Sequence, residues 1–401
     1  MTAFDPVLRK REAAEVNAAN PGPAEARTVS HLHPAGSFDV DSHLLPSGRE
    51  EVWRFTPLDR VEALLKDPPA GVIEITGDGL GPLPTLAIGQ TPRGTVLTPT
   101  DRAAALASAH TAAAAHVLIP AGQRLEEPLR LSLRAADPEA VVTGHLVIEA
   151  GPGSQAVIVL HHTGAARYLG NVEVSVGDEA RVTVVSLQDW DHTAVHLGQH
   201  EARVGRRGEY RHIAVSLGGD LIRLQNNVSY AGSGGAAQLF GVYFADAGQH
   251  IEHRLFVDHN HPKGTSLVDY RGALQGQHAR SVWVGDVLIR PEAKGIDTYE
   301  SNKNLVLSEG CRADAVPNLE IETGEIQGAG HSASTGRFDE EQLFYLRSRG
   351  LDEAAARRLV VRGFFAQLVA RIGVSDVEEA LMAKIDRELD QAERSRPLKG
   401  A

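Results

Sequence analysis

Short apolar runs punctuated by glycine dominate the middle of the chain, from about residue 144 to residue 336. Segments such as AVIVLHH, RVTVVSL, LFGVYFAD and VWVGDVLI are rich in β-branched and aromatic residues, which predicts a long series of β-strands. Ala156, Ala180, Tyr210 and Ala236 each open an apolar run after a glycine-containing turn, at intervals of roughly two to three dozen residues, a range typical of repeat folds. The pattern is compatible with a parallel β-helix and with a large β-sandwich, and the repeat favours the β-helix.

Helical patterns precede this β-rich region. We expect a helix that ends near Asn20, before the Pro/Gly break at residues 20–23, and a second helix from Leu58 to Lys66. Asp101 is a suitable N-cap for the alanine-rich run from Arg102 to Ala115, which has high helix propensity. The N-terminal part is therefore predicted to be a small helical or mixed α/β region.

The C-terminal part has the pattern of three amphipathic helices. Asp339 with Gln342 resembles a capping pair, and Gly350 stands where a helix C′ residue belongs. Asp352 is a suitable N-cap for the second helix, and Ser375 opens a Ser-x-x-Glu capping box for the third. Apolar residues follow at steps of four, namely Ala356, Val360, Phe364, Leu368 and Ile372, widened by Val361, Phe365 and Val369, and then Val377, Leu381, Ile385 and Leu389. These stripes must be covered by the β-rich region or by a partner.

Composition and charge exclude several classes of protein. The 401 residues are 42% apolar and 23% charged, which is ordinary for a globular protein. A net charge of -12 argues against a nucleic-acid partner. No segment approaches the roughly 18 consecutive apolar residues of a membrane span, and the N-terminus lacks the apolar stretch of a signal peptide, so we expect a cytoplasmic protein without membrane contact. A P-loop is absent, and GDGLG at residues 77–81 lacks the dinucleotide-binding spacing.

Histidines are unusually close together in the β-rich region. The groups are His161 and His162; His192, His196 and His200; His250 and His253; and His259 and His261. Two imidazoles on one β-face could bind a divalent metal, although a solvated or stacked polar ladder has the same spacing. Nearby carboxylates would suit a β-helical carbohydrate-active enzyme if two of them converged; they are Asp189, Asp191, Glu252 and Asp258. A His-rich metal-binding module and such an enzyme are the alternative functions.

Cys311 and His331 are the remaining candidates for chemistry. Cys311 is the single cysteine, which excludes an intramolecular disulfide and a cysteine-only metal site. It follows a glycine at the end of an apolar run, where its thiol is either partly exposed in a turn or buried and inert. His331, in GEIQGAGHSASTGRF, is flanked by small residues that leave an imidazole accessible.

The segment VPNLEIETGEIQGAGHSASTGRFDEEQLFYLRSRGLDEAAARRLVVRGFF resembles the C-terminal signature of the SufB/SufD family of iron-sulfur cluster assembly proteins. EEVWRFTPL resembles the N-terminal signature of the SufD branch, and GALQG, VWVGDVLI and NLVLSEG are similar to segments of the family's β-core, so the resemblance covers most of the chain. The chain lacks the N-terminal cysteine motif and the greater length of SufB, which favours the SufD branch.

The resemblance implies a mainly β fold with three parts. A right-handed parallel β-helix core over residues 131–336 would follow a helical or mixed N-terminal region over residues 1–130. A C-terminal α-helical domain over residues 337–401 would bind the SufC ATPase.

The resemblance also implies a function without catalysis. The chain would be a scaffold subunit of the SufB-SufC-SufD complex, paired with a SufB-like paralogue, and it would support cluster assembly and iron acquisition at their interface. A homodimer is possible in isolation. No cofactor is expected to stay bound to the isolated chain, and a transient iron-sulfur cluster or iron would be shared with SufB.

Motif match assigns roles to individual residues. His331 matches the family histidine implicated in cluster assembly at the partner interface, so it is a candidate ligand of iron or of the cluster. Cys311 lies near the position of the cluster-forming cysteine of SufB, and is either a second ligand or a coincidental thiol. The candidate SufC-facing residues are Phe344, Tyr345, Arg347, Arg349, Phe364, Phe365 and Leu368.

Overall fold

The structure is a computed structural model that describes residues 36–66, 69, 71–79 and 81–394. The helix expected up to Asn20 and the Pro/Gly break that follows lie outside the described residues. No helix within the described part of the chain is both long and apolar enough to cross a membrane.

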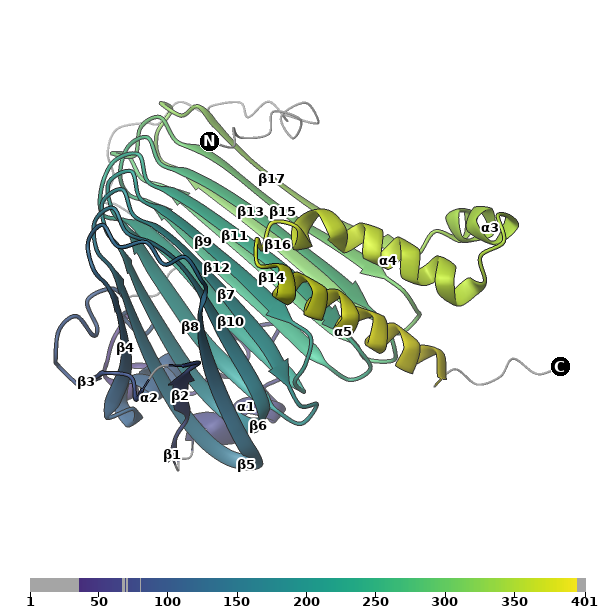
Figure 1. Ribbon diagram of the computed structural model, residues 1–401, viewed down its shortest axis with the longest axis horizontal. Helices are drawn as coiled ribbons and strands as arrows, with labels where there is room; N and C mark the ends of the chain where they lie inside the picture. The colour runs from purple at the N-terminus through teal and green to yellow at the C-terminus, as the bar shows by residue number, and fades with distance from the viewer. Residues whose placement is uncertain (1–35, 67–68, 70, 80, 395–401) are drawn as a thin grey trace.

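The β-rich region folds into a parallel β-solenoid of about eight turns, which confirms the predicted fold class (Figure 1). Three short strands precede it, β1 (Gly71–Val72), β2 (Glu74–Gly77) and β3 (Thr85–Ala87). The solenoid strands are β4 (Ala113–Ile119), β5 (Leu129–Ala150), β6 (Gln155–Val176), β7 (Arg181–Trp190), β8 (Val195–Val204), β9 (Glu209–Ser216), β10 (Leu221–Tyr230), β11 (Ala236–Ala245), β12 (His250–His259), β13 (Thr265–Leu274), β14 (Arg280–Ile289), β15 (Asp297–Val306), β16 (Arg312–Ile321) and β17 (Gly328–Arg337).

Alternate strands pair in parallel and so build two faces. One face stacks β7, β9, β11, β13, β15 and β17, and the other stacks β8, β10, β12, β14 and β16. The first half of β6 pairs with β7 and its second half with β8, so this long strand takes part in both faces. Gln155, Arg181, Glu209 and Ala236 lie in register on one face, within one residue of the positions that the sequence repeat picked out. The sandwich alternative is therefore wrong.

The bore of the solenoid is filled by side chains of alternate residues. Apolar residues such as Ile158, Val184, Leu224 and Ile251 are fully buried there. Where tyrosines enter the bore, the neighbouring strand provides a glycine, because a Cβ at Gly272 would overlap the ring of Tyr243 and one at Gly241 that of Tyr270; these residues lie on β11 and β13. The bore is a packed core and not an open channel.

The N-terminal region covers the outer face of β6, β8 and β10. It contains α1 (Leu58–Lys66), α2 (Arg102–His110) and the short 3₁₀ helices η2 (Val40–Ser42) and η3 (Glu51–Trp53). Their apolar side chains pack with outward residues of the solenoid; the cluster includes Trp53, Val61, Leu64, Leu106, Leu169, Leu197 and Leu221. The prediction of α1 is confirmed.

Helix α2 begins as predicted but ends early. The Asp101 side chain accepts a hydrogen bond from the Ala104 backbone N–H at 2.9 Å, as an N-cap does. The predicted extension to Ala115 is wrong, because residues from Ala113 onward form β4, which pairs with β3 and β5. Backbone pairing with the solenoid therefore overrides the helix propensity of alanine.

Three helices close the chain, α3 (Glu340–Ser348), α4 (Glu353–Val369) and α5 (Ser375–Arg394). Asp339 and Asp352 cap the first two, and Gly350 has a φ of +93°, as expected for a C′ residue. The capping box at Ser375 does not form: this residue is already helical, and the Glu378 carboxylate accepts instead from the Gly373 N–H at 2.9 Å.

Helices α4 and α5 lie over the outer face of the sheet that contains β7, β9, β11 and β13 (Figure 1). Their apolar stripes, including Phe365, Leu368 and Ile385, are buried against outward residues of these strands, such as Val215 and Phe240. The chain therefore covers most of both predicted stripes by itself.

Candidate functional site

The C-terminal end of the solenoid is an open edge. Among the described residues, β16 pairs only with β14, and β17 pairs only with β15. Figure 1 shows β17 at one end of the stack. The outer backbone groups of these two strands are therefore free to pair with another chain.

His331 lies on this edge, in β17. It is the register partner of Glu300 in β15, and its Nδ1 is 3.8 Å from Oε1 of Glu300. The His331 side chain is 43% exposed, whereas that of Glu300 is 1% exposed. Because register partners point to the same side of a sheet, His331 projects over the end of the bore, above Glu300.

Glu300 is a buried carboxyl group without a hydrogen-bond partner for either oxygen. It points across the bore to β14, where Gly285 leaves room for it: a Cβ at that position would overlap Oε2 of Glu300. Burial, assisted by the charge of Asp286, raises the pKa of Glu300 to about 9. The carboxyl group is therefore protonated and neutral at pH 7.

The polar groups beside Glu300 satisfy one another. The Tyr243 hydroxyl donates to Asn304 Oδ1 at 2.6 Å and accepts from Asn302 Nδ2 at 2.9 Å, and Asn304 Nδ2 donates to Asn302 Oδ1 at 2.6 Å. This closed network occupies the bore next to Glu300 and leaves the carboxyl group out. Among the described residues, the one side chain within ion-pair distance of Glu300 is that of His331.

Cys311 lies in the turn between β15 and β16 and is half-buried. Its Sγ is 3.3 Å from the carbonyl oxygen of Gly276, and burial raises the pKa of the thiol. The stretch of β15 between Glu300, the neighbour of His331, and Val306, just before this turn, spans about 20 Å. Cys311 and His331 of one chain therefore do not meet at one ion.

The histidine groups are divided between the bore and the outside. Five histidines of the predicted groups face the bore, namely His162, His196, His200, His253 and His259, and His200 Nδ1 lies 3.1 Å from Nε2 of His212 there. The rings of His162 and His196 lie 5.2 Å apart between centroids. Within the described part of the chain, no three His, Cys, Asp or Glu side chains gather in a group that could hold a metal ion. The stacked polar ladder is the reading that this geometry supports.

The carboxylates proposed for acid/base chemistry do not converge. Asp189 lies on the outer face of β7, where it contacts Lys384 of α5 and His161. Glu252 lies on the outer face of β12, on the opposite side of the solenoid. Asp258 pairs with Arg290 at 2.7 Å. This geometry gives no support to a carbohydrate-active site.

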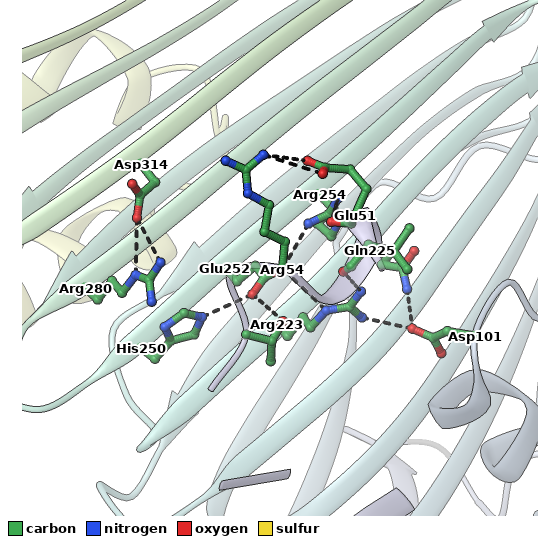
Figure 2. Close-up of polar contacts among 12 residues, drawn as sticks. Glu51, Arg54, Asp101, Arg223, Gln225, His250, Glu252, Arg254, Arg280 and Asp314 are labelled. Carbon is green, nitrogen blue, oxygen red and sulfur yellow. Dashed lines mark hydrogen bonds and ion pairs between the residues drawn. The ribbon is translucent and has the colours of Figure 1, made fainter. Parts of the chain in front are cut away.

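Glu252 instead belongs to a buried ionic cluster that the sequence analysis did not find. Figure 2 shows it between the N-terminal region and the outer face of β10 and β12. Arg223 lies 2.9 Å from Asp101 and 3.4 Å from Glu252, and its guanidinium stacks on the Trp53 ring at 4.1 Å. This cluster fastens the N-terminal region to the solenoid.

The candidate SufC-facing residues have different environments. Phe344 and Tyr345 of α3 are 75% and 56% exposed, and Arg347 and Arg349 are exposed beside them. Phe364 is partly buried. Phe365 and Leu368 are buried against the chain's own β-solenoid, so neither side chain is exposed to a partner in this structure.

A groove runs between α4 and α5 on the side away from the solenoid. Its volume is about 500 Å³, and its mainly apolar lining includes Leu359, Gly363, Ala366, Ala370, Met382 and Ala383. Arg362 and Asp386 pair across the groove.

Comparison with known proteins gives one family. Residues 133–364 match the model of the family described as "SUF system FeS cluster assembly, SufBD core domain". An iron-sulfur cluster assembly SufBD family protein of Mycobacterium tuberculosis is 48% identical over 376 residues, which is 89% of this chain and 92% of the relative. The iron-sulfur cluster assembly proteins SufD of Bacillus subtilis and Escherichia coli are 27% and 22% identical, over 69% and 68% of this chain and 64% and 66% of their own lengths.

Proposed function

Because this chain belongs to the SufBD family of iron-sulfur cluster assembly proteins, we propose that it is a non-catalytic scaffold subunit of the SUF complex, of the SufD type. In this role it pairs with a SufB-like paralogue in the cytoplasm, recruits a SufC-like ATPase, and supports cluster assembly and iron acquisition at the interface with the paralogue.

The observation that carries the proposal is the position of His331. It is a half-exposed imidazole at the open edge of a solenoid whose other described histidine clusters are buried or engaged elsewhere. An unprotonated ring nitrogen can bind iron, which is the substrate of assembly here and not a resident cofactor. The sulfur and further ligands come from the SufB-like partner, because Cys311 lies too far from His331 in the same chain to bind the same ion.

The edge of β16 and β17 is the surface proposed for the paralogue. Unpaired strand edges bind other strands through backbone hydrogen bonds, so a second solenoid can extend the sheet there. The same edge could serve a homodimer when the paralogue is absent.

The C-terminal helices are the proposed site for the ATPase subunit. The exposed surface of α3, formed by Phe344, Tyr345, Arg347 and Arg349, combines aromatic rings with cations, and the groove between α4 and α5 lies beside it. Exposed aromatic residues with arginine are typical of protein interfaces.

Co-expression with the SufB-like and SufC-like proteins of the same organism tests the scaffold role. We expect light scattering to give a complex of one SufB-like chain, two SufC-like chains and one copy of this chain. If the chain stays alone at every ratio, the scaffold proposal is wrong.

The role of His331 is tested in the reconstituted complex. His331→Ala should leave the complex assembled and lower the yield of cluster, measured by its visible absorbance, because an iron ligand is lost. His110→Ala, which removes an exposed histidine at the end of α2, is the control. An undiminished yield with His331→Ala removes this residue from the mechanism.

A further inference from the structure

The pair of Glu300 and His331 combines an exposed ligand with a buried one. Glu300 is almost completely buried, neither of its oxygens has a hydrogen-bond partner, and its Oε1 lies 3.8 Å from Nδ1 of His331. A carboxyl group buried without hydrogen bonds costs stability, even when it is protonated. Among the described residues, no hydrogen bond to either oxygen of Glu300 offsets this cost.

The alternative explanation, that Glu300 belongs to the internal polar network, does not fit the contacts. Asn302, Asn304 and Tyr243 are bonded to one another and not to the carboxyl group. Arginine is the usual partner of a buried carboxylate, as it is for Glu252 and Asp258 in this chain, but in the part of the chain that the structure describes no arginine or lysine forms an ion pair with Glu300. Its oxygens are therefore available to a cation that arrives from outside.

We propose that Glu300 is a second iron ligand from this chain, and that Glu300 and His331 together form a two-ligand acceptor site for ferrous iron at the open end of the solenoid. The inference rests on the proposed role of His331 and deepens it. Imidazole nitrogen with carboxylate oxygen is a donor set that suits divalent iron.

The geometry is close to that of a bound ion. Two ligand atoms that each lie about 2.1 Å from one metal ion are separated by about 3.0 to 3.6 Å at ordinary coordination angles. The observed 3.8 Å between Nδ1 and Oε1 needs only a small side-chain movement. When Fe²⁺ binds, the Glu300 carboxyl group loses its proton to solvent. The resulting carboxylate is then the negatively charged ligand of the ion.

This chain provides only two ligands, and both lie at the open end of the solenoid, so the remaining coordination positions of the ion are unfilled. Gly285 and the fully buried Trp283, both on β14, fill the bore beside Glu300, so further ligands approach from the open edge, from water or from the partner. A chain that holds iron through two ligands can pass it to an interface that provides stronger ones.

Metal titration of the purified full-length chain tests this inference. Under anaerobic conditions, Fe²⁺ binding by calorimetry, and Co²⁺ binding by its visible spectrum, should show one site per chain. Glu300→Gln should weaken binding by about 10- to 100-fold or more, and His331→Ala should do the same. Glu325→Gln, which changes an exposed carboxylate in the turn before β17, is the matched control and should bind as the unchanged chain does.

Thermal unfolding of the metal-free variants separates a ligand from a structural residue. Glu300→Gln should not lower the melting temperature, because the carboxyl group has no hydrogen bond to lose. Unchanged metal affinity in Glu300→Gln overturns the inference, and so does a loss of affinity that comes with a loss of stability.

Cluster yield distinguishes this inference from the proposed function. If both variants lower metal affinity and yield, both proposals are supported. If His331→Ala lowers them and Glu300→Gln lowers neither, the second ligand is wrong and the role of His331 stands. If neither variant changes the yield, the proposed function of this site fails as well.

Discussion

Glu252 and Glu300 are both buried glutamates in the solenoid, yet their surroundings make the first negatively charged and the second neutral at pH 7. Burial alone would raise the pKa of Glu252, but the hydrogen bond from His250 and the charges of Arg223 and Arg254 outweigh it and hold that pKa well below its usual range. Glu300 has no such partners, and burial raises its pKa to about 9. Glu252 is therefore part of an ion-pair cluster that stabilises the fold, whereas Glu300 is the proposed ligand of a metal cation.

Removing the charge of Glu252 should therefore destabilise the protein. Glu252→Gln removes the paired carboxylate of buried Arg254 and one of the two carboxylates that pair with Arg223, which should lower the free energy of unfolding by about 3 kcal/mol or more. Urea unfolding measures the change. Glu209→Gln, which breaks an exposed pair with Arg181, should cost less than about 1 kcal/mol. Equal effects of the two variants would show that the buried cluster does not fasten the N-terminal region.

At the scale of elements, the C-terminal helices divide between two tasks. The inner side of α4 and α5 completes the packing of the solenoid, whereas α3 lies beyond the ends of the strands (Figure 1). Two aromatic residues of α3, Phe344 and Tyr345, are exposed. Residues that stabilise the fold and residues available to a partner are therefore different residues on neighbouring helices.

Substitutions in α3 should affect binding of the ATPase subunit and not stability, whereas substitutions of buried residues in α4 should lower stability. The double variant Phe344→Ser, Tyr345→Ser should abolish capture of the ATPase subunit in a pull-down without lowering the melting temperature, because both rings are exposed. Phe365→Ala should cost about 3 to 5 kcal/mol of stability, because it leaves a cavity against the solenoid. Normal capture by the α3 variant would move the ATPase site elsewhere, with the groove between α4 and α5 as the next candidate.

At the scale of the whole molecule, the bore histidines link stability to pH. Burial lowers the pKa of four of them to about 3; they are His162, His212, His253 and His259. The unfolded chain takes up protons on these imidazoles near pH 6.5, whereas the folded chain does not until about pH 3. The stabilisation is therefore complete above about pH 6.5 and is lost as the pH falls below it.

We expect the melting temperature to fall steeply between pH 6.5 and pH 5. At pH 5 each of these histidines lowers the free energy of unfolding by about 2 kcal/mol relative to neutral pH. Thermal unfolding across this range measures the slope, which His253→Gln should reduce and His110→Ala, at an exposed position, should not. A melting temperature that is independent of pH would mean that the bore histidines can be protonated in the folded chain, which would contradict the lowered pKa values.

Local features of the fold were accessible from the sequence. The strand runs, the glycine turns, α1 and the caps at Asp101, Asp339 and Asp352 depend on residues a few positions apart. The repeat was visible as well, because each turn of the solenoid makes the same alternation of apolar residues and turns. The strand at Ala113 was missed, since its partners, β3 and β5, are set by pairing across the chain.

The site was accessible only in part. A motif pointed to His331 and its accessibility, but Glu300 lies in a strand that no local signal connects to it. The one available hint was that four polar residues occupy the inward positions of β15, at Thr298, Glu300, Asn302 and Asn304, and that the position of Glu300 is taken by Val268 in β13 and Leu239 in β11.

The sequence by itself determined the kind of elements, their order and the family, because these depend on local propensity, repeat and motif. Only the tertiary structure decided which residues meet. Parallel pairing between alternate strands joins residues that are a whole turn of the solenoid apart, and one residue of shift would move every side chain to the other face. That register places Glu300 beneath His331, carries Cys311 to the far turn and buries Phe365 against the solenoid.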